Sequence, residues 1–144
     1  MTELRKNIAK DLGWLERFYA EAGYGGTVQP EDRVFFAVSG EVIAGVVRLA
    51  IENGSLVLRG MQVAEAYRGK RIGMALLRYL ADDLGNKPCF CLPYSHLEAF
   101  YGIAGFQVAN DSEIPLFLAE RKHAYLHRGM DVVSMVRQSS GAVL

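Results

Sequence analysis

Apolar side chains recur at helical spacing near the start of the chain and give way to extended apolar runs soon afterwards. Residues 8–22 carry an apolar side chain every three or four positions, which predicts an amphipathic helix with Asn7 as its N-cap and Gly23 as its stop. Three extended apolar runs follow, at residues 34–38, 42–51 and 56–63. Because Asn53-Gly54 is a strong type I′ hairpin signal, the sequence predicts a three-stranded antiparallel meander.

Helical and strand patterns alternate in the second half of the chain. Helices are predicted at residues 70–84, 95–104 and 114–127, and Ser95 and Glu98 form a capping-box sequence in which each satisfies the other's terminal N–H group. Short strands are predicted at residues 89–92, 106–108 and 132–136. This order predicts an α/β fold in which an antiparallel N-terminal meander is followed by β-α-β-α-β, with helices on both faces of a central mixed sheet.

Length and charge restrict the classes of function. A chain of 144 residues is predicted to form one domain, residues 1–144, around a single core. Its 16 basic and 16 acidic residues cancel, which argues against a broad nucleic-acid surface. No apolar run approaches the roughly 20 residues that span a bilayer, so we expect a soluble cytoplasmic protein with no membrane partner.

The two cysteines, Cys89 and Cys91, lie two positions apart in a predicted strand. Their side chains share one face of that strand without suitable disulfide geometry, so we expect both to be small buried core residues. A metal site would need more ligands nearby than His96 supplies, and none is predicted.

Three cations and two glycines stand where an apolar strand gives way to a helix, in the sequence Arg68-Gly69-Lys70-Arg71-Ile72-Gly73. Cations at a helix N-terminus lie against the positive end of the macrodipole, each losing roughly 0.3 to 1 kcal/mol where the reverse charge would gain it. The first-turn N–H groups have no intrahelical partner, and glycines let a ligand approach the main chain, so this segment is a candidate phosphate cradle. A solvated basic turn is the alternative, and the strand-to-helix context favours the anion site.

Two segments are informative in combination. Residues 63–73 resemble the pattern Gln/Arg-x-x-Gly-x-Gly/Ala, with Arg68 and Gly73 at its ends, and residues 99–106 match A-x-x-F-Y-x-x-x-G-F almost without change. Together they resemble the pyrophosphate-binding motif and the downstream signature of the GNAT superfamily of acyl-CoA-dependent N-acetyltransferases. The element order agrees as far as Val136, so the resemblance covers nearly the whole chain and implies a GNAT-like fold. The family's middle glycine falls at Arg71, whose side chain either contacts the phosphates or points outward into solvent.

The resemblance implies a reaction, a cosubstrate and roles for individual residues. It implies transfer of an acetyl group from acetyl-CoA to a primary amine of a small-molecule acceptor, by direct attack in a ternary complex. The main chain of residues 61–63 would line the acetyl-pantetheine arm, residues 68–74 would hold the pyrophosphate, and Tyr101 would protonate the coenzyme A sulfur. Phe100 would pack in the core or flank the cofactor arm. The implied coenzyme-binding set is Met61, Gln62, Val63, Arg68, Gly69, Lys70, Arg71, Ile72, Gly73, Met74 and Phe100.

The position of Tyr101 in its helix can also be interpreted without the family resemblance, because Tyr101 shares the apolar stripe with Leu97 and Phe100. We expect its ring to be buried while its hydroxyl needs a partner. No general base is evident. Glu52, Glu65 and His96 have suitable chemistry, but the glutamates are expected to be solvated and the histidine to occupy the first turn of its helix, and a water chain would serve equally well.

Acceptor contacts are implied for the first helix, the loop after it and the late helix. Tyr24, Gly25 and Gly26 in that loop would border the acceptor pocket. Arg121 falls in the apolar stripe of the late helix, where it either binds a substrate carboxylate or, as we favour, pairs with an internal acid or extends its head to water.

Two other functions stay open. One is acetylation of a protein N-terminus or lysine, on which a net charge of zero gives little information. The other is a non-catalytic acyl-CoA-binding or sensing module, suggested by Arg71 and the missing base and opposed by the presence of Tyr101. A homodimer is also left open by the sequence.

Overall fold

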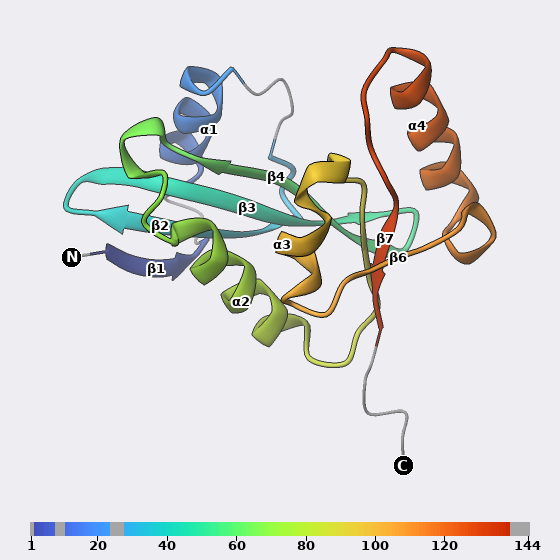
Figure 1. Ribbon diagram of the computed structural model, residues 1–144. Coiled ribbons are helices and arrows are strands. Elements are labelled where there is room, and N and C mark those ends of the chain that lie inside the picture. The colour runs from blue at the N-terminus through green and yellow to red at the C-terminus, as the bar shows by residue number, and fades with distance from the viewer. Residues whose placement is uncertain (1, 8–10, 24–27, 139–144) are drawn as a thin grey trace. The chain divides into compact units, whose positions relative to one another are not determined.

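The protein is described by a computed structural model that covers residues 2–7, 11–23 and 28–138 (Figure 1). The chain groups into two compact units. The first consists of residues 1–51 and 58–83, and the second of residues 52–57 and 84–144. The expectation of one domain over residues 1–144 stays a prediction.

Seven strands of the described residues form one mixed sheet in the order β1-β2-β3-β4-β5-β7-β6. Strand β4 pairs with β5 in parallel through Val57 and Phe90, whereas β1–β2, β2–β3, β5–β7 and β6–β7 are antiparallel pairs. The α/β fold class with a mixed sheet is therefore confirmed. The elements are β1 Thr2–Lys6, α1 Leu12–Glu21, β2 Arg33–Ser39, β3 Val42–Glu52, β4 Ser55–Val63, α2 Ile72–Leu84, β5 Cys89–Cys91, α3 Glu98–Gly102, β6 Gln107–Val108, α4 Leu116–His127 and β7 Met135–Arg137.

Strand β1 is an element that the hydrophobic pattern does not predict. It lies at the end of the strand order and pairs with β2 alone, and most of its side chains are exposed. With no buried face, it shows no apolar alternation. The N–H of Asn7 extends this pairing by donating to the Val34 carbonyl over 2.7 Å. Asn7 is therefore not a helix N-cap, and α1 begins only at Leu12; Ile8, the first apolar residue of the predicted helix, lies outside the described residues.

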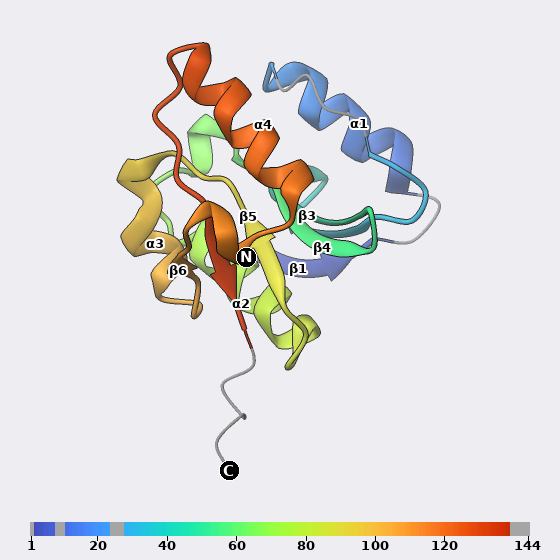
Figure 2. The ribbon, with the colours of Figure 1, turned by 90° about the vertical axis from the view of Figure 1, so that its right-hand side faces the viewer.

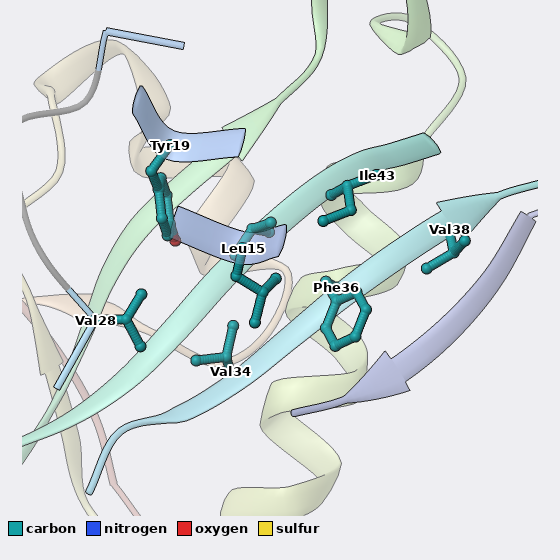
Figure 3. Close-up of a cluster of buried hydrophobic side chains, with 8 residues drawn as sticks. Leu15, Tyr19, Val28, Val34, Phe36, Val38 and Ile43 are labelled. Atoms are coloured by element: carbon teal, nitrogen blue, oxygen red, sulfur yellow. The ribbon is translucent and has the colours of Figure 1, made fainter. Parts of the chain in front are cut away.

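Helix α1 covers one face of strands β2 and β3 in the first unit (Figure 3). Full burial of one large apolar side chain stabilises a fold by roughly 1.5–3 kcal/mol, so this cluster holds the helix to the strands. On the opposite face, the ring of Phe35 meets the ring of Tyr79 in α2 with centroids 5.1 Å apart. Helices thus cover both faces of these strands, as predicted. The buried residues on the α1 side are Leu15, Tyr19, Val28, Val34, Phe36, Val38, Ile43 and Val46.

The predicted meander is confirmed, and its hairpin has the expected turn. Asn53 and Gly54 join β3 to β4 with φ values of 49° and 80°. Two successive residues with positive φ are what a type I′ turn requires, and Asn-Gly is the pair that adopts them with least strain.

Asp83, near the end of α2, ties that helix to strands β1 and β2. Its carboxylate oxygens accept hydrogen bonds from Lys6 Nζ at 2.8 Å and from Arg33 Nη1 at 2.5 Å. Burial raises the pKa of this carboxyl, but the hydrogen bonds from Lys6 and Arg33 outweigh burial and hold the pKa below its ordinary value.

Asp83→Asn is therefore expected to lower the free energy of unfolding by about 1 kcal/mol near pH 7, a modest effect because both cationic partners are partly exposed. A carboxyl with a lowered pKa stabilises the fold above its unfolded-state pKa, and that stabilisation is lost as the pH falls through the folded-state pKa. The difference between variant and wild type should accordingly shrink below about pH 4. Urea unfolding at pH 7 and pH 3 measures it. Asp82→Asn removes the neighbouring exposed carboxylate as a control, and equal losses in both variants would contradict the role of Asp83.

In the second unit, helix α4 packs against strands β5 and β7 (Figure 2). Cys89 and Cys91 are buried and carry reduced thiols, as predicted. Burial raises the pKa of the Cys91 thiol well above its ordinary value, so that thiol stays protonated and unreactive. The buried residues that hold α4 are Val57, Ala109, Ile114, Leu118, Ala119 and Val136.

Two predictions for the second unit are wrong in detail. Ser95 does not form a capping box with Glu98, because its hydroxyl donates to Asp131 Oδ2 over 2.6 Å and its N–H donates to the Asp131 carbonyl over 2.8 Å. A 3₁₀ turn occupies Ser95–Leu97, and α3 starts at Glu98. The last strand begins at Met135 rather than at Val132, which forms only an isolated bridge with Tyr94.

Candidate active site

The chain turns sharply between the end of β4 and the start of α2. A 3₁₀ turn at Glu65–Tyr67 follows β4, and α2 begins at Ile72, two residues later than predicted. The delay has a backbone cause, because Gly69 and Arg71 both adopt left-handed conformations, with φ values of 79° and 63°. This conformation costs a residue with a Cβ roughly 1–2 kcal/mol, whereas glycine adopts it freely. The left-handed backbone at Arg71 thus explains why the pyrophosphate-binding motif has a glycine at this position.

Arg71→Gly and Arg71→Ala test this conformation. Both remove the guanidinium, but only glycine relieves the backbone strain, so we expect Arg71→Gly to be more stable than Arg71→Ala by about 1 kcal/mol. At Lys70, whose φ is not positive, the order should reverse and alanine should be the more stable residue. Urea unfolding of the four variants measures both differences. The same order at both positions would contradict a left-handed Arg71.

The three cations of this turn are exposed, but two of them have defined neighbours. Arg68 Nε donates to the carbonyl of Val63 over 3.1 Å, which ties the turn to the last residue of β4. Lys70 Nζ lies 5.7 Å from the centre of the Tyr67 ring. Arg71 makes no ion pair with the described residues, so its positive charge is available to a ligand.

The first turn of α2 adds main-chain donors to these cations. The N–H of Ala75 donates to the Arg71 carbonyl over 3.1 Å, and the N–H groups of Ile72, Gly73 and Met74 precede any intrahelical acceptor. A helix N-terminus with adjacent cations attracts anions, since both the dipole and the side chains favour negative charge. This part of the first unit is called the cradle below and consists of residues 68–74.

Gly45 in β3 brings the start of α2 close to the strands. A Cβ on Gly45 would lie 3.1 Å from Ile72 Cγ2, 3.1 Å from Leu76 Cδ1 and 3.3 Å from the Gln62 carbonyl oxygen. A larger residue would therefore push the helix away from β3. Gly45 was not among the predicted site residues, although an isolated glycine in an apolar strand is a signal of close packing.

Buried polar side chains surround Gly60 in β4. The Tyr19 hydroxyl donates to the Gly60 carbonyl over 2.6 Å, and Gly60 has a φ of 64°, where a Cβ would lie 2.7 Å from that hydroxyl oxygen. Beside it, Arg48 and Asp32 form an ion pair of 2.7 Å with side chains only 3% and 1% exposed. Glycine adopts this left-handed conformation freely, and the hydrogen bond to its carbonyl fixes the main chain there. None of these four residues was predicted to belong to the site.

Tyr101 is held by aromatic contacts in the second unit. Its ring meets those of Phe100 and Phe106 edge to face, with centroids 5.0 and 6.0 Å apart, and the residue is 5% exposed. Burial, with a smaller contribution from Cys91, raises the pKa of Tyr101 well above its ordinary value of 10.0. The phenol is therefore protonated at neutral pH. It has the state of a proton donor and not of a general base.

The other side chains with suitable chemistry are paired with a neighbour or exposed to solvent. Arg121 Nη2 pairs with Glu52 Oε1 at 2.6 Å, so the favoured hypothesis of an internal acid partner is confirmed, and Glu52 is paired rather than simply solvated. Glu65 is exposed, as expected. His96 is exposed and stacks on the Tyr94 ring at 5.9 Å. Three predicted acceptor residues, Tyr24, Gly25 and Gly26, lie outside the described residues.

Two features are absent from the part of the chain that the structure describes. None of its helices has the length and apolar character needed to cross a bilayer. It also holds no group of three or more His, Cys, Asp or Glu side chains arranged to bind a metal ion.

Comparison with models of known protein families decides the family. Residues 30–108 match the model of the acetyltransferase (GNAT) domain, a stretch that includes both the cradle and Tyr101. The chain belongs to the GNAT family of acetyltransferases. The resemblance inferred from the two motifs is thereby confirmed.

Solved structures share the fold of this GNAT acetyltransferase at low sequence identity. The ribosomal-protein-S18-alanine N-acetyltransferase from Escherichia coli is 16% identical with a TM-score of 0.69, covering 100% of this chain and 99% of that chain. An acyl-CoA N-acyltransferase from Pseudomonas aeruginosa is 17% identical with a TM-score of 0.70, covering 95% and 99%. N-acetylglutamate synthase from Neisseria gonorrhoeae, solved with coenzyme A and N-acetyl-glutamate, is 18% identical with a TM-score of 0.67, covering 96% of this chain and 35% of that chain. No curated protein sequence gives a significant match.

Proposed function

We propose that this GNAT acetyltransferase transfers an acetyl group from acetyl-CoA to a primary amine of a small-molecule acceptor, by direct attack in a ternary complex. The observation that carries the proposal is the cradle. Its two left-handed residues, its three cations and the first-turn N–H groups of α2 suit a pyrophosphate, because each contributes positive charge or a hydrogen-bond donor. Family membership makes acetyl-CoA the natural source of that pyrophosphate.

The proposed coenzyme site uses the main chain more than side chains. Residues 68–74 hold the pyrophosphate, and the main chain of residues 61–63 lines the acetyl-pantetheine arm. The close packing at Gly45 and the left-handed Gly60 support these roles, because they fix the strand and the helix that carry the donors. Phe100 flanks the arm or packs beside Tyr101. Residues 1–144 act as one N-acetyltransferase domain in this proposal.

Tyr101 has the proposed role of proton donor. Bound acetyl-CoA supplies a thioester whose carbonyl carbon is open to attack by the amine nitrogen. As the carbon–sulfur bond breaks, Tyr101 donates its phenolic proton to the departing sulfur, which leaves as the thiol. This role requires a protonated phenol, and burial, which raises the pKa of Tyr101, keeps its proton in place at neutral pH. The attacking nitrogen loses its proton to solvent water, and no side chain is assigned as the base.

A second candidate acceptor is the N-terminal amine of a protein. The observation that favours it is the shared fold with the ribosomal-protein-S18-alanine N-acetyltransferase, which covers the whole of this chain. The chemistry at the thioester is the same for both acceptors, so the two candidates differ only in what brings the amine to the site.

Thiol release from acetyl-CoA tests the proposal. A panel of amino acids, polyamines and aminoglycosides is compared with peptides that have free N-termini, at equal amine concentration. Faster release with a small amine than with every peptide supports the proposal, and the reverse order supports the second candidate. Saturable acetyl-CoA binding with no amine-dependent release would instead indicate a non-catalytic binding module.

A further inference from the structure

Residues of strand β1, of the cradle and of helix α2 line a groove in the first unit. Its volume is about 490 Å³, within the range of roughly 300–1,000 Å³ that is usual for small-molecule sites. Leu4 lines the groove from β1, Arg71 lines it from the cradle, and successive turns of α2 contribute Met74, Arg78, Tyr79 and Asp82.

The cationic side chains in this groove are not paired with carboxylates of the described residues, in contrast to those at the end of β1. Where β1 ends, Lys6 and Arg33 both pair with Asp83. Within the groove, Arg71 and Arg78 make no ion pair with any described residue, and Asp82 is the single acid among the lining residues. Two cations and one anion leave a net charge of +1 on the lining, so the groove favours an anion.

The wall between these arginines is apolar. Leu4 is 38% exposed although it is a large hydrophobic residue, and Met74 and Tyr79 are half-buried. Exposed apolar surface of this kind gains from being covered, since each square ångström removed from water contributes roughly 25 cal/mol. The groove thus combines an apolar wall with two guanidinium groups.

Arg71 gives the groove a feature that a glycine at this position would not. Its left-handed backbone carries a cost that glycine would avoid, and the arginine adds a cationic side chain to the lining of the groove. Strain that persists in a folded chain is a reason to look for a function of the strained side chain.

We propose that this groove binds a small amphipathic anion, namely an organic carboxylate or phosphate monoester with an apolar body. The guanidinium groups of Arg71 and Arg78 take the anionic head through paired N–H donors, a geometry that suits both carboxylate and phosphate oxygens. The apolar body lies along Leu4 and Met74. The site goes beyond the acetyl-transfer function, and it shares Arg71 with the cradle.

Calorimetric titration without acetyl-CoA tests the site, using 4-phenylbutyrate, octanoate and phenyl phosphate as probes. At least one probe should bind saturably at millimolar concentration or below, and backbone amide shifts should be centred on Leu4, Met74 and Arg78. The neutral 4-phenylbutanol should bind at least about tenfold more weakly than 4-phenylbutyrate, because it lacks the charge-assisted hydrogen bonds. The stronger of the carboxylate and phosphate probes identifies the preferred head group.

Arg78→Gln removes one guanidinium from the groove and leaves the cradle residues unchanged. It should weaken the bound probe roughly tenfold, whereas Arg17→Gln, which removes the same charge from an exposed position on α1, should leave the affinity unchanged. Three outcomes would each overturn the proposal: no saturable binding of any probe, equal affinity in the two variants, or amide shifts centred outside the groove.

Discussion

Gly73→Glu is expected to abolish acetyl-CoA binding, with a loss of affinity of at least about 100-fold, or roughly 2.7 kcal/mol. Gly73 lies in the first turn of α2, where the main-chain N–H groups are proposed to receive the pyrophosphate. A glutamate there places bulk in the path of the phosphates and a negative charge against them, so contact and charge both oppose binding. Equilibrium titration of acetyl-CoA measures the loss.

Gly13→Glu provides the matched control for this variant. Gly13 lies on α1 of the same unit, and a Cβ there would meet nothing within 4 Å. The control adds the same charge and should bind acetyl-CoA as wild type does. Gly73→Ala, which adds only a methyl group, should weaken binding less than Gly73→Glu does, and thermal unfolding of all three shows whether each is folded. A folded Gly73→Glu variant with unchanged affinity would remove the cradle as the coenzyme site.

Tyr101→Phe is expected to lower kcat by about 100-fold or more, while the affinity for acetyl-CoA stays within about twofold of wild type. The variant keeps the ring and its contacts with Phe100 and Phe106, and it loses only the proton that the sulfur is proposed to take. Initial rates of thiol release, together with a binding titration, separate the two effects.

Tyr125→Phe removes a phenol from α4 in the same unit and serves as the control. The Arg128 guanidinium lies 5.5 Å from the centre of the Tyr125 ring. Loss of the Tyr125 hydroxyl should leave kcat unchanged. If Tyr101→Phe keeps the wild-type kcat, or if both variants lose turnover equally, Tyr101 is not the proton donor.

Strong periodicity predicted most of the fold. The strands that became β2, β3 and β4 carry long apolar runs and a hairpin sequence whose left-handed residues are those of the observed turn. The long helices α2 and α4 were also predicted, because their apolar stripes face a core. The hydrophobic pattern failed at β1, whose five residues bury little and are held by pairing with β2. An edge strand of this kind has almost no signal in its own sequence.

The local errors have two causes, a distant hydrogen-bond partner in one case and a left-handed backbone in the other. Ser95 and Glu98 have the spacing of a capping box, but Asp131, 36 positions away from Ser95, takes the serine hydroxyl instead. Helix α2 starts late because Gly69 and Arg71 adopt left-handed conformations, which a helical pattern beginning at Lys70 does not reveal. Both the distant partner and the left-handed backbone depend on the folded chain, so neither can be inferred from the spacing of residues alone.

The candidate site was predicted unevenly. Its motif residues, the cradle and Tyr101, were identified from two short segments that fall within the matched GNAT domain. The residues that pack around β4 and the start of α2 were not identified, namely Gly45, Gly60 and the buried pair of Arg48 with Asp32. A buried ion pair and a close approach to glycine link residues on separate elements, so no single segment contains the pattern that would identify them.

The most direct test of the cradle is to map acetyl-CoA on the amide groups of the wild-type protein. In a titration followed by ¹H–¹⁵N correlation spectra, the largest shifts should fall on the N–H groups of Gly69, Arg71, Ile72, Gly73 and Met74, with one coenzyme bound per chain. Saturable binding whose largest shifts lie outside residues 68–74 would contradict the cradle as the pyrophosphate site.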